Sequence, residues 1–165
     1  MNTSSNKEYH YNLLFICLGN ICRSPAADAI MHKLVDDNGL SRNFTIDSAG
    51  IGNWHVGDLP DRRMREHGAK RGYDISHIAR QFNKVTDFDA SDYIVMDDDN
   101  YSEICVQAKD ARQRSKVVKM KDFFSRHKGE TSVPDPYYGD AKDFEFALDL
   151  IEDGCRGLLC SLVEI

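Results

Sequence analysis

Short apolar runs alternate with longer stretches in which apolar residues recur every three or four positions. A run such as LLFIC, flanked by polar residues, is typical of a buried strand. Four such runs predict strands, at residues 11–17, 44–49, 91–96 and 116–120. The segment 44–49 also alternates, as FTIDSA, which fits a strand in a pleated sheet.

The longer stretches predict helices. Apolar residues recur at helical spacing after Pro25, and Gly39 is a suitable end for that helix. Further helices are expected at 60–68, at 101–109 and in the tail at 144–162. The tail segment is amphipathic, and Gly154 and Gly157 are expected to weaken its middle.

Strands that alternate with helices predict an α/β fold, in which a parallel sheet carries helices on both faces. The 165 residues contain no repeat, low-complexity tract or linker, so a single domain is expected. In such folds ligands bind beyond the carboxyl ends of the strands. The sequence FICLGNICRSP, residues 15–25, lies at that end of the first predicted strand.

Composition narrows the classes of function. A net charge of −6 argues against a general nucleic-acid or anionic-membrane surface. The polar start MNTSSNKEYHYN has no apolar signal core, and no run reaches the length of a membrane span. The cytoplasm is therefore the expected location, and the five cysteines are expected to be thiols there.

The loop between the first strand and the next helix has the features of an anion cradle. Backbone N–H groups and a helix N-terminus would point at one centre, and Gly19 and Asn20 tolerate the positive φ of a tight loop. Arg23 could close the cradle with a bidentate grip on a phosphoryl group. The same field would present Cys17 as a thiolate aimed at phosphorus, with Ser24 donating a hydrogen bond to the sulfur.

Other interpretations of the cysteines stay open at this point. A cysteine at a strand end is often a small buried apolar residue. A metal site is disfavoured, because Cys17 and Cys22 have no second Cys or His pair at ligand spacing. A redox role is compatible with catalysis, since Cys22 could form a disulfide with Cys17 and protect it from over-oxidation.

A phosphate ester also needs a proton donor for its leaving oxygen. In VPDPYYG, Asp135 lies between two prolines that restrict its backbone, and Tyr137 and Tyr138 could wall an aromatic slot. Trp54, in a glycine-rich loop, could pack against a phenyl group from the other side. The alternatives are an ordinary surface turn and a rim tryptophan.

The order of CLGNICRSPAA, TIDSAG, HIARQF, DYIVMDDDN and DPYYG resembles the low-molecular-weight protein tyrosine phosphatases. The match runs from about residue 13 to 162. The resemblance implies a four-stranded parallel sheet in the order 2-1-3-4 and a phosphatase domain at 11–165. The N-terminal stretch has no counterpart in the family, and a disordered or irregular extension is expected at 1–10. It implies Cys17 as nucleophile, Arg23 as phosphate clamp and Asp135 as acid and then base.

The resemblance also assigns supporting roles. The phosphate-binding loop would comprise Leu18, Gly19, Asn20, Ile21, Cys22 and Ser24. Asn20, Ser24, Ser48 and His77 would hold that loop by hydrogen bonds, and Asp97 matches an acidic position near the site. Trp54, Tyr137 and Tyr138 match the aromatic rim that favours phosphotyrosine, although HVGDLPDRRM after Trp54 matches the family only loosely.

The implied partners are phosphotyrosine proteins and cellular thiol reductants, with no nucleic acid, membrane, metal or organic cofactor. Three rival functions follow from the same scaffold. Protein-arginine phosphatases carry Thr where this chain has Ile21, and tend to Asp-Pro-Phe in the acid loop. An arsenate reductase needs a relay of two further cysteines, for which the chain offers Cys105, Cys155 and Cys160. A binding module would have lost Cys17 or Asp135, and both are present.

Overall fold

The computed structural model describes residues 9–90 and 92–163. Its centre is a parallel sheet of four strands in the order β2-β1-β3-β4, which confirms the predicted topology. The strands are β1 (Tyr11–Cys17), β2 (Phe44–Gly50), β3 (Asp92–Val95) and β4 (Val117–Lys119). Most of the predicted N-terminal extension, residues 1–8, lies outside the described residues.

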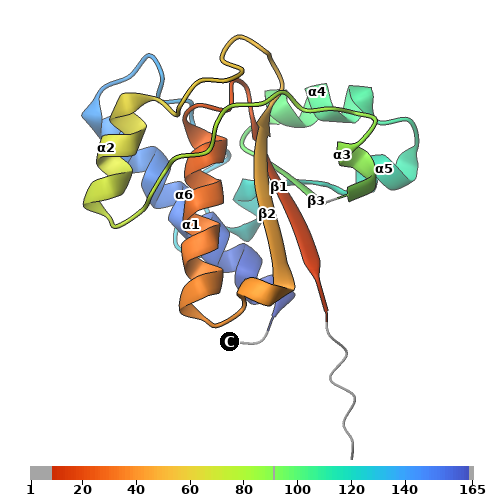
Figure 1. The fold of residues 1–165 in the computed structure, drawn as a ribbon, viewed down its shortest axis with the longest axis horizontal. Helices are drawn as coiled ribbons and strands as arrows, with labels where there is room; N and C mark the ends of the chain where they lie inside the picture. Colours follow the sequence, from red (N-terminus) through yellow and green to blue (C-terminus); the bar gives the residue numbers. More distant parts are fainter. Residues whose placement is uncertain (1–8, 91, 164–165) are drawn as a thin grey trace, which may run out of the picture.

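Helices cover both faces of the sheet (Figure 1). One face carries α1 (Arg23–Asp37), α2 (Arg62–Lys70) and α6 (Ala141–Leu162). The other carries α3 (Asp87–Ala90), α4 (Asp98–Gln107) and α5 (Ala111–Ser115). Two short 3-10 helices, η1 (Ser41–Asn43) and η2 (Met120–Phe123), complete the described elements.

The central strand β1 contributes to two separate cores. Leu13 and Phe15 face the core under α1 and α6, whereas Leu14 and Ile16 face the core under α4. All four side chains are almost fully buried. Burial on both sides explains why this strand reads as a continuous apolar run and not as an alternating one.

Helix boundaries differ from the predictions for local reasons. α1 begins at Arg23, before Pro25, because a proline is tolerated within the first helical turn. α2 begins at Arg62, and the preceding Asp61 caps it by accepting a hydrogen bond from the Arg63 amide. α4 begins at Asp98, earlier than predicted, after the cap Asp97. The short helices α3 and α5 have too few residues to show a periodic pattern.

The tail helix α6 starts earlier than predicted and is unbroken. A capping box formed by Asp140 and Asp143 fixes its start, so it includes Ala141. A Cβ atom on Gly157 would lie 1.9 Å from the carbonyl oxygen of Phe123. Gly154 is equally crowded by Met120. The two glycines therefore lower the helix propensity of α6, but they allow η2 to pack directly on it.

Candidate active site

The loop from Cys17 to Ser24 connects the carboxyl end of β1 to the first turn of α1. Asn20 has a positive φ of 57° and is fully buried. Its side-chain nitrogen, Nδ2, donates to Ser24 Oγ at 2.8 Å and to Ser48 Oγ at 3.0 Å. Its Oδ1 accepts a hydrogen bond from the Arg80 amide at 3.0 Å. One side chain thus ties the loop to α1, to β2 and to the segment that contains Arg80.

The two cysteines of the loop have different environments. Cys17 Sγ lies 3.0 Å from Ser24 Oγ, at the end of the strand and beside the start of α1. Burial, and then the nearby charge of Asp61, raise the pKa of the Cys22 thiol well above its usual range. Cys22 is therefore kept as a neutral thiol, and Cys17 is the candidate nucleophile.

Arg23 extends from the start of α1 and is only 2% exposed. Its Nη1 donates to Asp97 Oδ2 at 2.6 Å and to the carbonyl oxygen of Val133 at 2.9 Å. Burial alone would lower the pKa of this guanidinium, but the charge of Cys17 and the hydrogen bond to Asp97 outweigh it and raise that pKa. Arg23 is consequently a fixed positive charge in the site.

A cavity of about 360 Å³ opens above the loop. It is lined by Cys17, Leu18, Gly19, Ile21, Cys22, Arg23, Trp54, His55, Asp135, Tyr137 and Tyr138. Asp135 Oδ2 lies 3.7 Å from Arg23 Nη2, and Asp135 Oδ1 accepts a hydrogen bond from the Tyr137 amide at 3.2 Å. The structure therefore brings the predicted nucleophile, clamp, acid and aromatic residues to a single cavity.

Comparison with known proteins decides the family. The family model for low molecular weight phosphotyrosine protein phosphatases matches residues 12–164. This chain belongs to that family. It is accordingly a protein tyrosine phosphatase, a hydrolase of phosphoric monoesters.

Individual relatives agree with the family match. The human low molecular weight phosphotyrosine protein phosphatase is 36% identical over 149 residues, covering 90% of this chain and 93% of the human one. A Synechocystis protein, described as a candidate member of the family, is 49% identical, with 91% of this chain and 95% of its own covered. The crystal structure of a protein tyrosine phosphatase from Entamoeba histolytica superposes with a TM-score of 0.88, at 42% identity, over 92% of this chain and 96% of that one.

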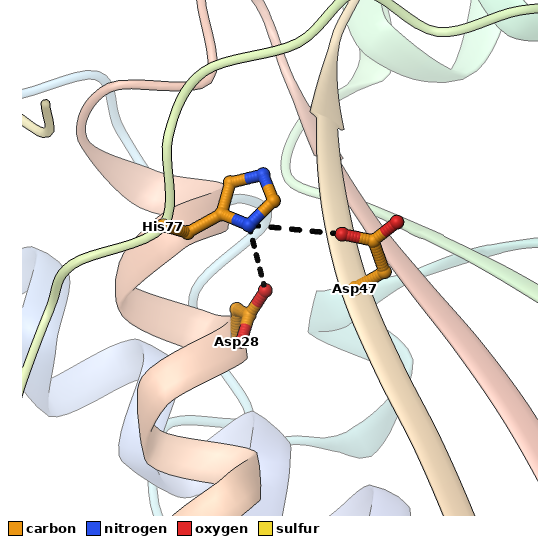
Figure 2. Close-up of side chains that lie close together, drawn as sticks. All are labelled: Asp28, Asp47 and His77. Carbon is orange, nitrogen blue, oxygen red and sulfur yellow. Dashed lines mark ion pairs between the residues drawn. The ribbon is translucent and has the colours of Figure 1, made fainter. Parts of the chain in front are cut away.

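Ser48 and His77, the two residues outside the phosphate-binding loop that were expected to support it, differ in their contacts with that loop. Ser48 bonds directly to Asn20, as the resemblance implies. His77 lies instead between α1 and β2, where its Nδ1 faces Asp28 and Asp47 (Figure 2). Across the described residues, no hydrogen bond joins His77 to the phosphate-binding loop, so any support that it gives is indirect.

Three residues around the loop of the phosphatase were not singled out from the sequence. A Cβ atom on Gly50 would lie 2.9 Å from the carbonyl carbon of Gly19, so β2 can approach the loop only without a side chain there. Arg80 holds Asn20 through its backbone amide, which no side-chain pattern could reveal. His55 lines the cavity, and its only signal was its place after Trp54.

Proposed function

We propose that this phosphatase works in two steps through a phosphocysteine. In the first step Cys17 Sγ attacks phosphorus, a P–S bond forms and the bond to the ester oxygen breaks. The position of Cys17 among the residues that line the cavity, beside the N-terminus of α1, is the observation that carries this proposal. Ser24 Oγ, 3.0 Å from the sulfur, stabilises the thiolate when it leaves in the second step.

Arg23 and the loop amides stabilise the charge that builds on the equatorial oxygens during both steps. Arg23 Nη1 makes the contacts with Asp97 and Val133. Its Nη2 faces Asp135, with the carboxylate oxygen Oδ2 at 3.7 Å. A guanidinium already fixed by such contacts loses little freedom when it binds phosphate.

Asp135 is the proposed general acid and base. It protonates the leaving phenolic oxygen, and the resulting carboxylate then accepts a proton from the water that cleaves the phosphocysteine. Its carboxylate is partly exposed, lines the cavity together with Tyr137 and lies 3.7 Å from Arg23 Nη2. The Val133 amide donates to the Met96 carbonyl at 2.9 Å, which anchors this segment to the end of β3.

The proposed substrates are proteins that carry phosphotyrosine. Trp54 and Tyr138 are largely exposed at the mouth of the cavity, while Tyr137 packs edge-on against Tyr138 with ring centroids 4.9 Å apart. Aromatic faces on the rim favour a flat phenyl ring over a small alkyl phosphate. Ile21, bulky and without a hydrogen-bond donor, also lines the cavity and favours tyrosine phosphate over arginine phosphate.

We further propose reversible redox control in the cytoplasm. Cys17 and Cys22 line the same cavity and are free thiols. A peroxide would oxidise the Cys17 thiolate to a sulfenic acid, which Cys22 would convert to a disulfide with loss of water. Cellular dithiols would return both cysteines to thiols by exchange. In the described residues, no helix combines the length and apolarity of a membrane span.

Rapid-quench kinetics on an aryl phosphate with a good leaving group test the chemistry. The expected result is a burst of phenol whose amount equals that of the active sites. Phosphate should then be held on the protein as acid-labile S-phosphocysteine. Cys17→Ser should remove both the burst and turnover, while Cys22→Ser should retain the burst. Turnover by Cys17→Ser, or phosphate trapped on another residue, would overturn the assignment. Faster turnover of phosphoarginine than of phosphotyrosine would favour the arginine-phosphatase alternative.

A further inference from the structure

Away from the active site, three potential ligands for a metal ion meet between α1 and β2. They are the carboxylates of Asp28 on α1 and Asp47 on β2, and the imidazole of His77 on the segment after α2 (Figure 2). One ligand atom from each residue lies within 4.8 Å of the other two. Two carboxylate oxygens and one imidazole nitrogen form a donor set that suits Zn²⁺ and related divalent transition metals.

The imidazole and the two carboxylates face one another at distances longer than those of good hydrogen bonds. His77 Nδ1 lies 3.6 Å from Asp28 Oδ2 and 3.7 Å from Asp47 Oδ1, and both distances are too long for good hydrogen bonds. A tetrahedral Zn²⁺ with bonds of about 2.0–2.1 Å holds its ligand atoms about 3.3–3.4 Å apart. The three atoms lie within 4.8 Å of one another, so side-chain rotations that draw them together would complete this geometry. Among the described residues, His77 Nε2 is buried and has no hydrogen-bond partner, and the contacts of this imidazole with the two carboxylates are made by Nδ1.

Neighbouring groups already orient both carboxylates. His32 Nδ1 lies 2.8 Å from Asp28 Oδ1, which leaves Asp28 Oδ2 facing His77. Arg80 Nη2 donates to Asp47 Oδ2 at 2.9 Å, and Asp47 Oδ1 accepts a hydrogen bond from the Ser48 amide at 2.8 Å while it faces the same nitrogen. Outer contacts of this kind fix ligand orientation in protein metal sites.

A cation can reach Asp28 and His77 through a groove between α1 and the segment 72–77. Asp28 and His77 line this groove, together with Asp36, Asp37 and Asp74. Its carboxylates outnumber the one lysine among the residues that line it, Lys33. The groove therefore has a negative potential that attracts cations.

We propose that Asp28, Asp47 and His77 form a binding site for a divalent transition-metal ion such as Zn²⁺. The site is separate from the catalytic cavity but contacts the segments that hold it. Asp47 precedes Ser48, which bonds Asn20, and Arg80 contacts both Asp47 and Asn20. A bound ion would tie α1, β2 and the segment after α2 together, and would stabilise the folded state.

Zinc titration of the Cys17→Ser protein tests this site without the reactive thiol. One equivalent of Zn²⁺ is expected to bind and to raise the Tm by several degrees. Asp28→Asn and His77→Gln should each weaken Zn²⁺ binding about tenfold or more. Asp37→Asn removes a carboxylate from the same groove but leaves the three ligands intact, so it should bind Zn²⁺ normally. Circular dichroism without metal would show which variants fold.

Cobalt tests for cysteine ligands independently of these variants. Co²⁺ in the Cys17→Ser protein should give d–d absorption bands without a sulfur-to-metal charge-transfer band. Such a charge-transfer band would place the metal on the remaining cysteines and overturn the proposal. Unchanged Zn²⁺ affinity in Asp28→Asn, or the absence of both binding and a change in Tm for Cys17→Ser, would overturn it too.

Discussion

The guanidinium of Arg23 and the carboxylate of Asp97 form an ion pair at 2.6 Å between the start of α1 and the start of α4. Asp97 also caps α4, because its other carboxylate oxygen accepts a hydrogen bond from the Asn100 backbone amide. The residue therefore couples the proposed phosphate clamp to a helix on the opposite face of the sheet. Asparagine could keep the cap while losing the ion pair.

Asp97→Asn is therefore expected to lower kcat/KM about 10–100-fold, because Arg23 would be less well oriented toward phosphate. Loss of a charged partner for a buried guanidinium should also reduce the free energy of unfolding by about 1–3 kcal/mol. Steady-state kinetics and urea unfolding measure the two effects. Asp98→Asn is the matched control, since Asp98 is exposed on the same helix and pairs with Lys119. Similar losses in both variants would contradict a special role for Asp97.

Asp135→Ala should slow turnover about 10²–10⁴-fold on phosphotyrosine, whose leaving oxygen needs a proton. The loss should be much smaller for an aryl phosphate whose leaving group is stable as an anion. Comparing kcat for the two substrates provides the measurement. Tyr138→Ala, next to the acid loop but without a carboxylate, should not change the ratio between them. Equal losses on both substrates for Asp135→Ala would argue against its role as the acid.

Gly157→Ala is expected to destabilise the fold although alanine favours helices by about 1 kcal/mol over glycine. The new Cβ would collide with the Phe123 carbonyl oxygen, which is a backbone atom and cannot rotate away. The net loss should be about 1–3 kcal/mol, seen as a lower Tm. Gly129→Ala is the control, because in the described part of the chain no atom outside its sequence neighbours lies within 4 Å of the position of its Cβ. A stabilised Gly157→Ala protein would show that η2 can shift away from α6 at little cost.

Asp153 on α6 should contribute a stability that depends on pH. Burial opposes its ionisation, but hydrogen bonds from Ser125 and His127 outweigh burial and lower its pKa to about 2. Because the folded pKa lies below the unfolded value, the contribution is complete above about pH 4 and disappears as the pH falls toward 2. Asp153→Asn should therefore cost about 2 kcal/mol at pH 7 and little at pH 2.

Urea unfolding of both proteins at several pH values checks this prediction. Asp149→Asn, one turn away on the same helix and half exposed, should show a smaller difference. A difference between wild type and Asp153→Asn that stays constant from pH 7 to pH 2 would mean that the carboxylate charge is not the source of the stability.

Much of the fold could be predicted because strong local patterns coincide with buried elements. The apolar runs located all four strands, and helical spacing located α1 and α6, whereas α2 was expected from a short charged stretch that ends in glycine. The helix starts were less predictable, since capping by Asp61 and Asp140 depends on side-chain geometry. The short helices α3 and α5 have too few residues to leave a periodic signal.

The candidate site could be predicted where chemistry requires particular residue types close together in the sequence. Cys17 and Arg23 belong to one loop, and Asp135 is recognisable by its flanking prolines and tyrosines. Contacts made by the backbone were not visible in this way. Arg80 bonds Asn20 through its amide, and Gly50 matters because it lacks a side chain. The placement of His77 beside two aspartates depends on segments far apart in the sequence.

The left-handed conformation of Asn20 has a consequence for the thermodynamics of anion binding. An asparagine at φ 57° that uses both its amide nitrogen and its oxygen in buried hydrogen bonds has little freedom left. The loop loses its conformational entropy when the chain folds, so little ordering remains to oppose the arrival of phosphate. A rigid tetrahedral receptor should bind any oxyanion of the same shape and charge, which makes inorganic phosphate, the product of the reaction, a natural competitor of the substrate.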